Sequence, residues 1–234
     1  MSPPTESSAI PGPSPRPATR SRLAWVSGER LSGWLERFQA AHGQLRIEES
    51  ENGVSLFALD GSFAELAAPW PVAGRPGRGA DPVQRLASLS EQSRTVVVLL
   101  IRRGGYAVSL CRDGQVLASK IGTRYVQSRT AAGGWSQQRF ARRRANQADA
   151  MIEAVADHAA ALPTEQAEYL VLGGDKAMAA TLIAEPAVSA LAKLERLAFL
   201  DVPDPRAKVL AEAAKQVRSV RIKVTDGPSP AALS

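Results

Sequence analysis

Apolar and polar residues alternate with two different periods in the first part of this chain. An apolar residue at every third or fourth position predicts an amphipathic helix between Ser27, a suitable N-cap, and Gly43, which ends it. Two segments of period two flank the turn-forming sequence Glu-Asn-Gly, and they predict a β-hairpin over residues 45–59. We expect a further strand or turn at residues 62–66, so this part is a small α+β unit.

The pattern breaks over residues 67–79, where prolines, glycines and arginines cannot continue a helix or a central strand. Longer apolar segments follow, in the order β-β-β-α-β-α-β-α. This order predicts a mixed sheet covered by helices, an α/β (α+β) fold, because parallel strands need crossover connections. The expected elements are a meander of strands at 95–101, 106–111 and 115–122, a helix at 151–162, a strand at 169–172, helices at 175–184 and 186–193, a strand at 197–200, a helix at 206–217 and a closing edge strand at 220–224.

These patterns divide the chain into four segments. Residues 1–21 are rich in proline and poor in apolar residues, so we expect a disordered tail that is neither a signal peptide nor a membrane anchor. Residues 22–92 are the small N-terminal unit with its linker, residues 93–225 are the main domain, and residues 226–234 are a flexible C-terminus.

Positive charge is concentrated in one part of the chain. The net charge is +6, whereas residues 102–147 alone carry ten basic residues and one acid, which makes this window +9. The remainder is therefore about −3. A localised basic region of this kind favours a polyanionic partner such as RNA. The single cysteine, Cys111, excludes an intrachain disulfide and a Cys-x-x-Cys zinc site, which fits a cytoplasmic protein.

The centre of the basic region is residues 130–147, which connect a predicted strand to a predicted helix. Such connections are usually short and uncharged, whereas this one contains a glycine pair, a tryptophan, two adjacent glutamines and four arginines. Arg139, Arg142 and Arg143 have the spacing i, i+3, i+4, which places them on one helical face if the helix extends this far back. Cations at a helix N-terminus oppose the helix dipole, so phosphate contact would explain them. The candidate RNA-binding residues are Arg124, Arg129, Arg139, Arg142, Arg143 and Arg144.

This stretch lacks the usual acid/base groups. No Asp or Glu occurs between Asp113 and Asp149, and no His occurs between His42 and His158. A general base and a metal-binding cluster are therefore absent from the stretch, and we expect no metal and no organic cofactor. A glutamine amide can still orient a water molecule, because it both accepts and donates hydrogen bonds.

Two acids and a histidine elsewhere have simpler interpretations. Asp175 follows a strand and suits the N-cap of the next helix, and Asp201 suits a loop. His158 falls within an apolar helical pattern, so we expect a packed or surface histidine and not a ligand.

A three-stranded meander, a Gly-Gly loop with a glutamine and a long following helix resemble the central, peptide-releasing domain of eukaryotic and archaeal release factors. The sequence GGWSQQRFARRRANQ at residues 133–147 is more similar to the Vms-like release factors, and specifically to their actinobacterial branch. The resemblance covers about residues 93–224. One departure is that Trp135 and Ser136 separate the glycines from the first glutamine.

The resemblance implies a ribonuclease-H-like fold and hydrolysis of the ester between a nascent peptide and tRNA on the large ribosomal subunit. It implies that Gln137 places the attacking water, and that the residues around it position the loop. These positioning residues are Gly133, Gly134, Trp135, Ser136 and Gln138. The implied partners are the large subunit, peptidyl-tRNA and rRNA, with a monomeric protein and no membrane.

Two alternatives remain open at the level of sequence. A nuclease that cuts the 3′ end of tRNA would also release peptides, and a protein without catalytic activity could use the arginines only to bind RNA or the ribosome. The cost of clustering cations also predicts that residues 130–146 form a loop that is mobile in the free protein and ordered when bound.

Overall fold

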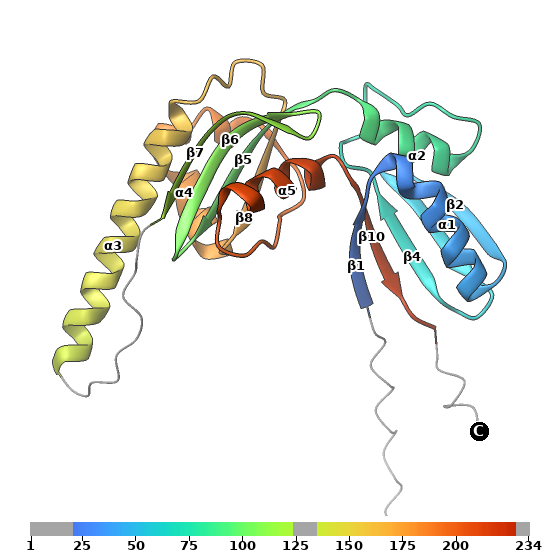
Figure 1. Cartoon of the computed structure of the whole chain (residues 1–234), viewed down its shortest axis with the longest axis horizontal. Coiled ribbons are helices and arrows are strands. Elements are labelled where there is room, and N and C mark those ends of the chain that lie inside the picture. Colours follow the sequence, from blue (N-terminus) through green and yellow to red (C-terminus); the bar gives the residue numbers. More distant parts are fainter. Residues whose placement is uncertain (1–20, 124–134, 228–234) are drawn as a thin grey trace, which may run out of the picture.

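The computed structural model describes residues 21–123 and 135–227, and for residues 135–147 it describes the backbone alone. The described chain forms two five-stranded β-sheets that lie side by side, each with its own helices (Figure 1). No helix within these ranges is both long and apolar enough to cross a membrane.

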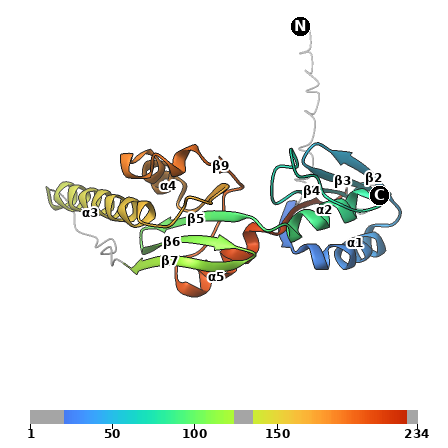
Figure 2. The ribbon, with the colours of Figure 1, turned by 90° about the horizontal axis from the view of Figure 1, so that it is seen from above.

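The first sheet is antiparallel throughout and has the strand order β1-β10-β4-β3-β2. Helices α1 (Gly28–His42) and α2 (Pro82–Glu91) cover one of its faces (Figure 2). Leu31 of α1 and Leu86 of α2 belong to the same buried cluster as Leu56 and Ile222 of the sheet. The strands are β1 (Ser21–Val26), β2 (Leu45–Ser50), β3 (Gly53–Ala58), β4 (Phe63–Ala67) and β10 (Val220–Thr225).

The sequence predicted only part of this sheet. The helix before Gly43, the hairpin of β2 and β3, and β4 are confirmed. Strand β1 and helix α2 were not predicted, and β1 begins at Ser21, which the sequence assigned to the tail. Strand β10 was predicted as an edge strand of the main domain, but it pairs with β1 and β4 inside the first sheet. Its alternation of apolar and polar residues predicts a strand with one buried face. The alternation does not determine which strands β10 pairs with, because any sheet with an unpaired edge could accept it.

The second sheet is mixed and has the order β7-β6-β5-β8-β9. The first three strands are an antiparallel meander, and β8 and β9 run parallel to β5. The predicted mixed α/β class and the meander are therefore confirmed. The strands are β5 (Thr95–Arg102), β6 (Gly105–Arg112), β7 (Gln115–Thr123), β8 (Tyr169–Gly174) and β9 (Glu195–Arg196).

Helices cover both faces of the second sheet (Figure 2). Helices α3 (Trp135–Ala160) and α4 (Lys176–Ala184) lie on one face, and α5 (Ala207–Val217) lies on the other. The predicted helix at 186–193 is two 3₁₀ turns, η1 (Pro186–Val188) and η2 (Leu191–Lys193). The predicted strand at 197–200 was also wrong. The strand in this region, β9, lies just before these residues, and of residues 197–200 only Leu200 forms a β-bridge, with Gly173.

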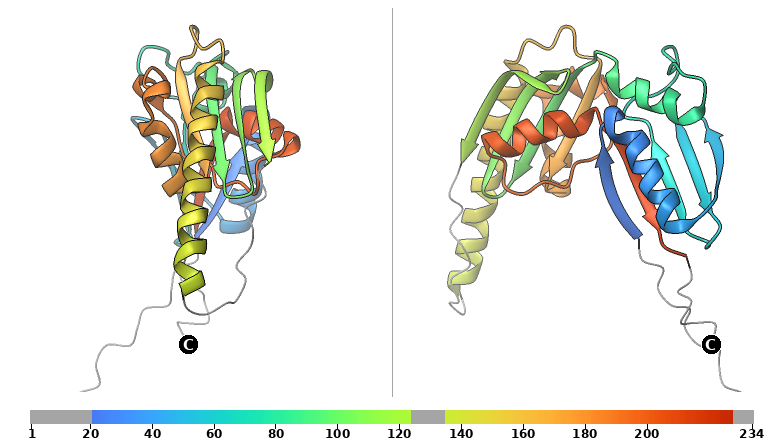
Figure 3. Two further views of the ribbon diagram at one scale, coloured as in Figure 1. Left: turned by 90° about the vertical axis from the view of Figure 1, so that its left-hand side faces the viewer. Right: turned by 45° about the vertical axis from the view of Figure 1, so that its right-hand side comes forward.

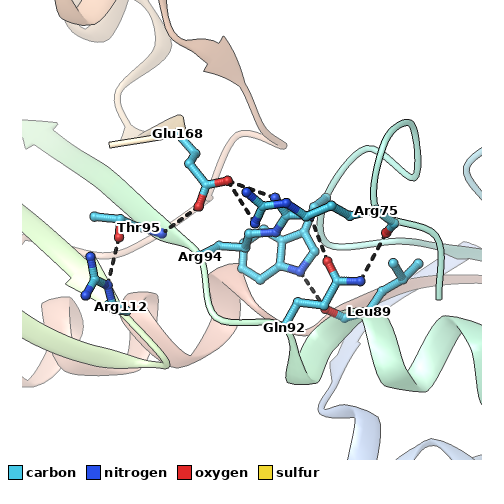
Figure 4. Close-up of polar contacts among 8 residues, drawn as sticks. Arg75, Leu89, Gln92, Arg94, Thr95, Arg112 and Glu168 are labelled. Atoms are coloured by element: carbon cyan, nitrogen blue, oxygen red, sulfur yellow. Dashed lines mark hydrogen bonds and ion pairs between the residues drawn. The ribbon is translucent and has the colours of Figure 1, made fainter. Parts of the chain in front are cut away.

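The two units are joined by apolar packing and by polar contacts. One buried cluster runs through both, and in it the ring of Trp70 stacks on Tyr169 with 5.9 Å between centroids. Arg94, in the connection between α2 and β5, donates from Nη1 to Glu168 Oε2 (2.8 Å) and from Nη2 to Gln92 Oε1 (2.7 Å) (Figure 4). Arg75 Nη1 lies 3.3 Å from the same Glu168 oxygen, so Glu168 joins both units.

Candidate active site at the edge of the second sheet

Three strands of the second sheet end at the same edge. Strands β5, β7 and β8 run in the same direction, because β6 is antiparallel to both β5 and β7 while β8 is parallel to β5. Their last residues are Arg102, Thr123 and Gly174. We call this the C-terminal edge. Strand β7 ends at this edge with Thr123, and the next described element along the chain is α3, which starts at Trp135.

Helix α3 extends well past the C-terminal edge. Its 26 residues span about 39 Å. The second half packs on the sheet through Met151, Ile152, Val155 and Ala159, all of which are buried. The first half runs beyond the ends of the strands, which Figures 1 and 3 show from different directions. The start of α3 is therefore the part of the helix furthest from the sheet.

Helical geometry divides the positions at the start of α3 between two faces. Position 137 lies 18 residues, or five full turns, before Val155, so it is in line with the buried residues of the helix. Position 138 is rotated from it by about 100°. Positions 139, 142 and 143 occupy the opposite side of the helix, whereas position 144 lies close to the line of position 137.

The structure places the predicted site residues as follows. Residues Arg124, Arg129, Gly133 and Gly134 lie outside the described residues. The others belong to the first turns of α3, where the sequence predicted a loop up to Asn146; they are Trp135, Ser136, Gln137, Gln138, Arg139, Arg142, Arg143 and Arg144.

The helix begins early because of its composition. Alanine, glutamine and arginine are strong helix formers, and together they outweigh the unfavourable placement of cations near the helix start. The conditional expectation that Arg139, Arg142 and Arg143 share a helical face therefore holds for the backbone positions.

Of the basic residues in the described part of the basic region, 102–147, only some lie at the C-terminal edge. Arg102 is there, and its Nη1 donates to Val202 O at 2.6 Å, while Arg103 is exposed in the following turn. Arg112 lies at the opposite edge, where it donates to Thr95 Oγ1 and Gln166 Oε1. Lys120 is exposed on β7, opposite Val108.

One acid near the C-terminal edge was not predicted. A Cβ atom on Gly104 would lie 2.9 Å from Asp204 Oδ2, so this exposed carboxylate sits directly beside the turn between β5 and β6. No local pattern could have placed it there, because Asp204 is about one hundred residues away in a loop and only the tertiary fold brings it close.

Asp175 and the two glycines before it serve the local fold. The Asp175 carboxylate accepts from the backbone N–H groups of Ala177 (2.9 Å) and Met178 (3.1 Å), so the predicted N-cap of α4 is confirmed. Gly174 has a φ of 95°, and a Cβ atom on Gly173 would approach Leu200 O to 2.8 Å. This turn therefore needs glycines for packing, independently of any phosphate.

The capping role of Asp175 leads to a testable prediction. The Asp175→Asn variant keeps an oxygen acceptor for the helix and loses the charge, so we expect its stability to remain close to that of the wild type. Asp175→Ala should lower the free energy of unfolding by about 1 kcal/mol. Urea denaturation measures both. If Asp175→Asn folded normally but lost the activity of the protein, the carboxylate would have a chemical role and not only a capping one.

Other reactive side chains in the described ranges are structurally accounted for. Cys111 is buried, and burial raises the pKa of its thiol, so the nucleophilic thiolate is disfavoured. His158, predicted to be a packed or surface histidine, is half-buried, and its ring stacks on Tyr106 with 5.7 Å between the ring centroids. Within residues 21–123 and 135–227, no group of three or more His, Cys, Asp or Glu could hold a metal ion.

Comparison with known proteins identifies the family of this chain. No curated protein matches the chain significantly. The sequence profile of the family described as "Actinobacteria/chloroflexi VLRF1 release factor" matches residues 94–223, which is more than half of the chain and includes the whole second sheet with α3. The chain therefore belongs to the Actinobacteria/chloroflexi VLRF1 release factor family.

Proposed function

We propose that this protein is a peptidyl-tRNA hydrolase that releases nascent chains from the ribosome. The observation that carries the proposal is the position of Gln137. It lies in the first turn of α3, at the end of the helix that extends beyond the sheet, in a chain that belongs to a release factor family. A release factor must bring its reactive group into a narrow RNA site, and a projecting helix end suits that task.

The chemistry asked of Gln137 is the positioning of water. The water oxygen attacks the ester carbonyl, the bond to the terminal ribose oxygen breaks, and the products are a free peptide carboxylate and a tRNA with its 3′ hydroxyl. Gln137 holds the water in line with the carbonyl, while Gly133 and Gly134 allow the backbone to approach closely. Gln137 does not change protonation state, so the surrounding RNA supplies the proton acceptor.

The arginines take the role of RNA ligands in this proposal. Positions 139, 142 and 143 lie on the side of α3 opposite to position 137, so one side of the helix can bind phosphates while the other presents the amide. We assign RNA contacts to Arg124, Arg129 and Arg144 as well. Trp135, Ser136 and Gln138 shape the segment around Gln137.

Membership of a release factor family implies association with the ribosome. We further propose that the site of action is the large subunit, with peptidyl-tRNA and rRNA as direct partners, and that the protein works as a cytoplasmic monomer without cofactor.

The products of the reaction test the proposal. Large subunits carrying peptidyl-tRNA are incubated with the full chain, and the 3′ ends of the released tRNA are sequenced. We expect tRNA with a complete CCA end, because the ester is the bond that breaks. A shortened end would instead establish a nuclease, and binding to the subunits without any released peptide would establish a protein that only docks.

A further inference from the structure

The first sheet has a face that no described helix covers. Helices α1 and α2 lie on the other side of this sheet (Figure 2). The strand registers define one row that crosses all five strands of the open face: Ser50, Gly53, Ala67, Arg221 and Trp25. Three consecutive small residues leave this row without large side chains on β2, β3 and β4, so it forms a hollow bordered by Arg221 and Trp25.

Two adjoining cavities follow this row. A groove of about 480 Å³ lies over the open face and is lined by Leu23, Ser55, Glu65 and Lys223 among others. A cleft of about 430 Å³ continues it toward the second sheet, where Glu195, Arg196 and Leu197 form the opposite wall. Asn52, Ala67 and Arg221 line both cavities, so the two are one continuous depression. We call it the inter-sheet groove.

Charge and aromatic surface in the inter-sheet groove fit a nucleic acid strand. Lys223 Nζ lies 3.5 Å from Glu65 Oε2, but neither Arg196 nor Arg221 has a carboxylate within 4.0 Å in the part of the chain that the structure describes. Both guanidinium groups are exposed at the rim, and Arg221 is directly opposite Trp25 in the strand register. Guanidinium groups pair with phosphates, and a half-buried tryptophan offers a surface for base stacking.

We propose that the inter-sheet groove binds a single-stranded segment of RNA. Arg196 and Arg221 bind its phosphates and Trp25 stacks on a base. An apolar peptide fits less well, because it would cover two arginines without pairing them. Figure 1 shows the first sheet on the side of the second sheet that is away from the start of α3, so the groove is a second contact, separate from the proposed catalytic end. Two distant contacts orient the protein and raise its overall affinity.

The proposal is tested by RNA binding that does not depend on α3. In the full chain, Arg139, Arg142 and Arg143 are first replaced together by serine, so that the remaining affinity comes from other surfaces. Fluorescence anisotropy then measures binding of a fluorescein-labelled single-stranded U12 RNA. Adding Arg221→Ser should weaken this binding about tenfold and reduce the salt dependence by about one phosphate contact.

The matched control is Arg37→Ser, which removes the same charge from the exposed side of α1, on the covered side of the sheet. We expect no more than a slight change in affinity. Equal losses with Arg37→Ser and Arg221→Ser would overturn the proposal, as would a background chain that does not bind U12 at all. If Arg221→Ser weakened binding to large subunits but not to U12, the groove would bind a protein, and the RNA assignment would be wrong. None of these readouts requires peptide release, so they are independent of the proposed hydrolase activity.

Discussion

Replacing Gln137 with alanine should reduce peptide release by at least about a hundredfold, the loss typical of removing one group that positions or stabilises the reacting atoms. The stretch between Asp113 and Asp149 contains no carboxylate, so no neighbouring group in it can replace the amide. Binding to the large subunit should stay unchanged, because the candidate phosphate ligands remain. Release is measured as free peptide from large subunits loaded with peptidyl-tRNA, and binding by co-sedimentation.

The control is Gln138→Ala, which removes the same amide from a position rotated by about 100° around α3. Position 137 lies on the same face of α3 as the buried Val155, whereas position 138 lies on a different face. We therefore expect the Gln138→Ala variant to keep most of its release activity. If Gln138→Ala abolished release and Gln137→Ala did not, the assignment would move to Gln138. If both variants released peptide normally, no glutamine would position the water and the proposed mechanism would be wrong.

Replacing Glu168 with alanine should destabilise the whole protein by about 2–3 kcal/mol. The Arg94 side chain is only 4% exposed, and its Nε has no hydrogen-bond partner among the described residues. Glu168 accepts from Arg94 Nη1 at 2.8 Å, so its removal leaves a buried cation without its carboxylate (Figure 4). The expected loss of stability is at the low end of the range for breaking a buried ion pair, because the Glu168 side chain itself is 31% exposed. Urea denaturation measures the free energy of unfolding.

Glu165→Ala is the matched control, since Glu165 is exposed in the same loop and has no ion pair in the described part of the chain. We expect a change within about 0.5 kcal/mol. The destabilisation caused by Arg75→Ala should lie between the values for the Glu165 and Glu168 variants. The Arg75 side chain pairs with Glu168 at 3.3 Å, but it is 57% exposed. Equal stability of the Glu168 and Glu165 variants would show that the pair with Arg94 contributes nothing to the junction.

The sequence predicted best where a local pattern determines the structure. The meander of β5, β6 and β7 could be predicted because β5 and β6 are mostly apolar and the turns between the strands are short. Asp113 and Gly114 both have the positive φ that an Asp-Gly hairpin turn requires. Asp175 could be assigned as a cap for a similar reason, since strand, glycine pair, acid and apolar helix follow one another directly.

The sequence failed where the partner of an element is distant. Strand β10 has a clear strand pattern, yet nothing in residues 220–225 indicates that it pairs with β1 and β4. Asp204 reaches the turn at Gly104 only through the tertiary fold. The early start of α3 was missed because the arginines suggested a loop, whereas helix propensity summed over many residues outweighs a local charge effect. The inter-sheet groove depends on strand register and on both sheets, so no segment of sequence contains it.

The position of β10 also affects how the chain is made. Within the described residues β1 pairs with β10 alone, and Ser21 lies opposite Thr225. During synthesis the backbone groups of β1 therefore stay unpaired until β10 has left the ribosome. The second unit can form first, since its five strands are contiguous in the sequence. The first sheet, and with it the groove beside Arg221, is then completed last, so a nascent chain stopped short of residue 220 would carry the projecting helix without that groove.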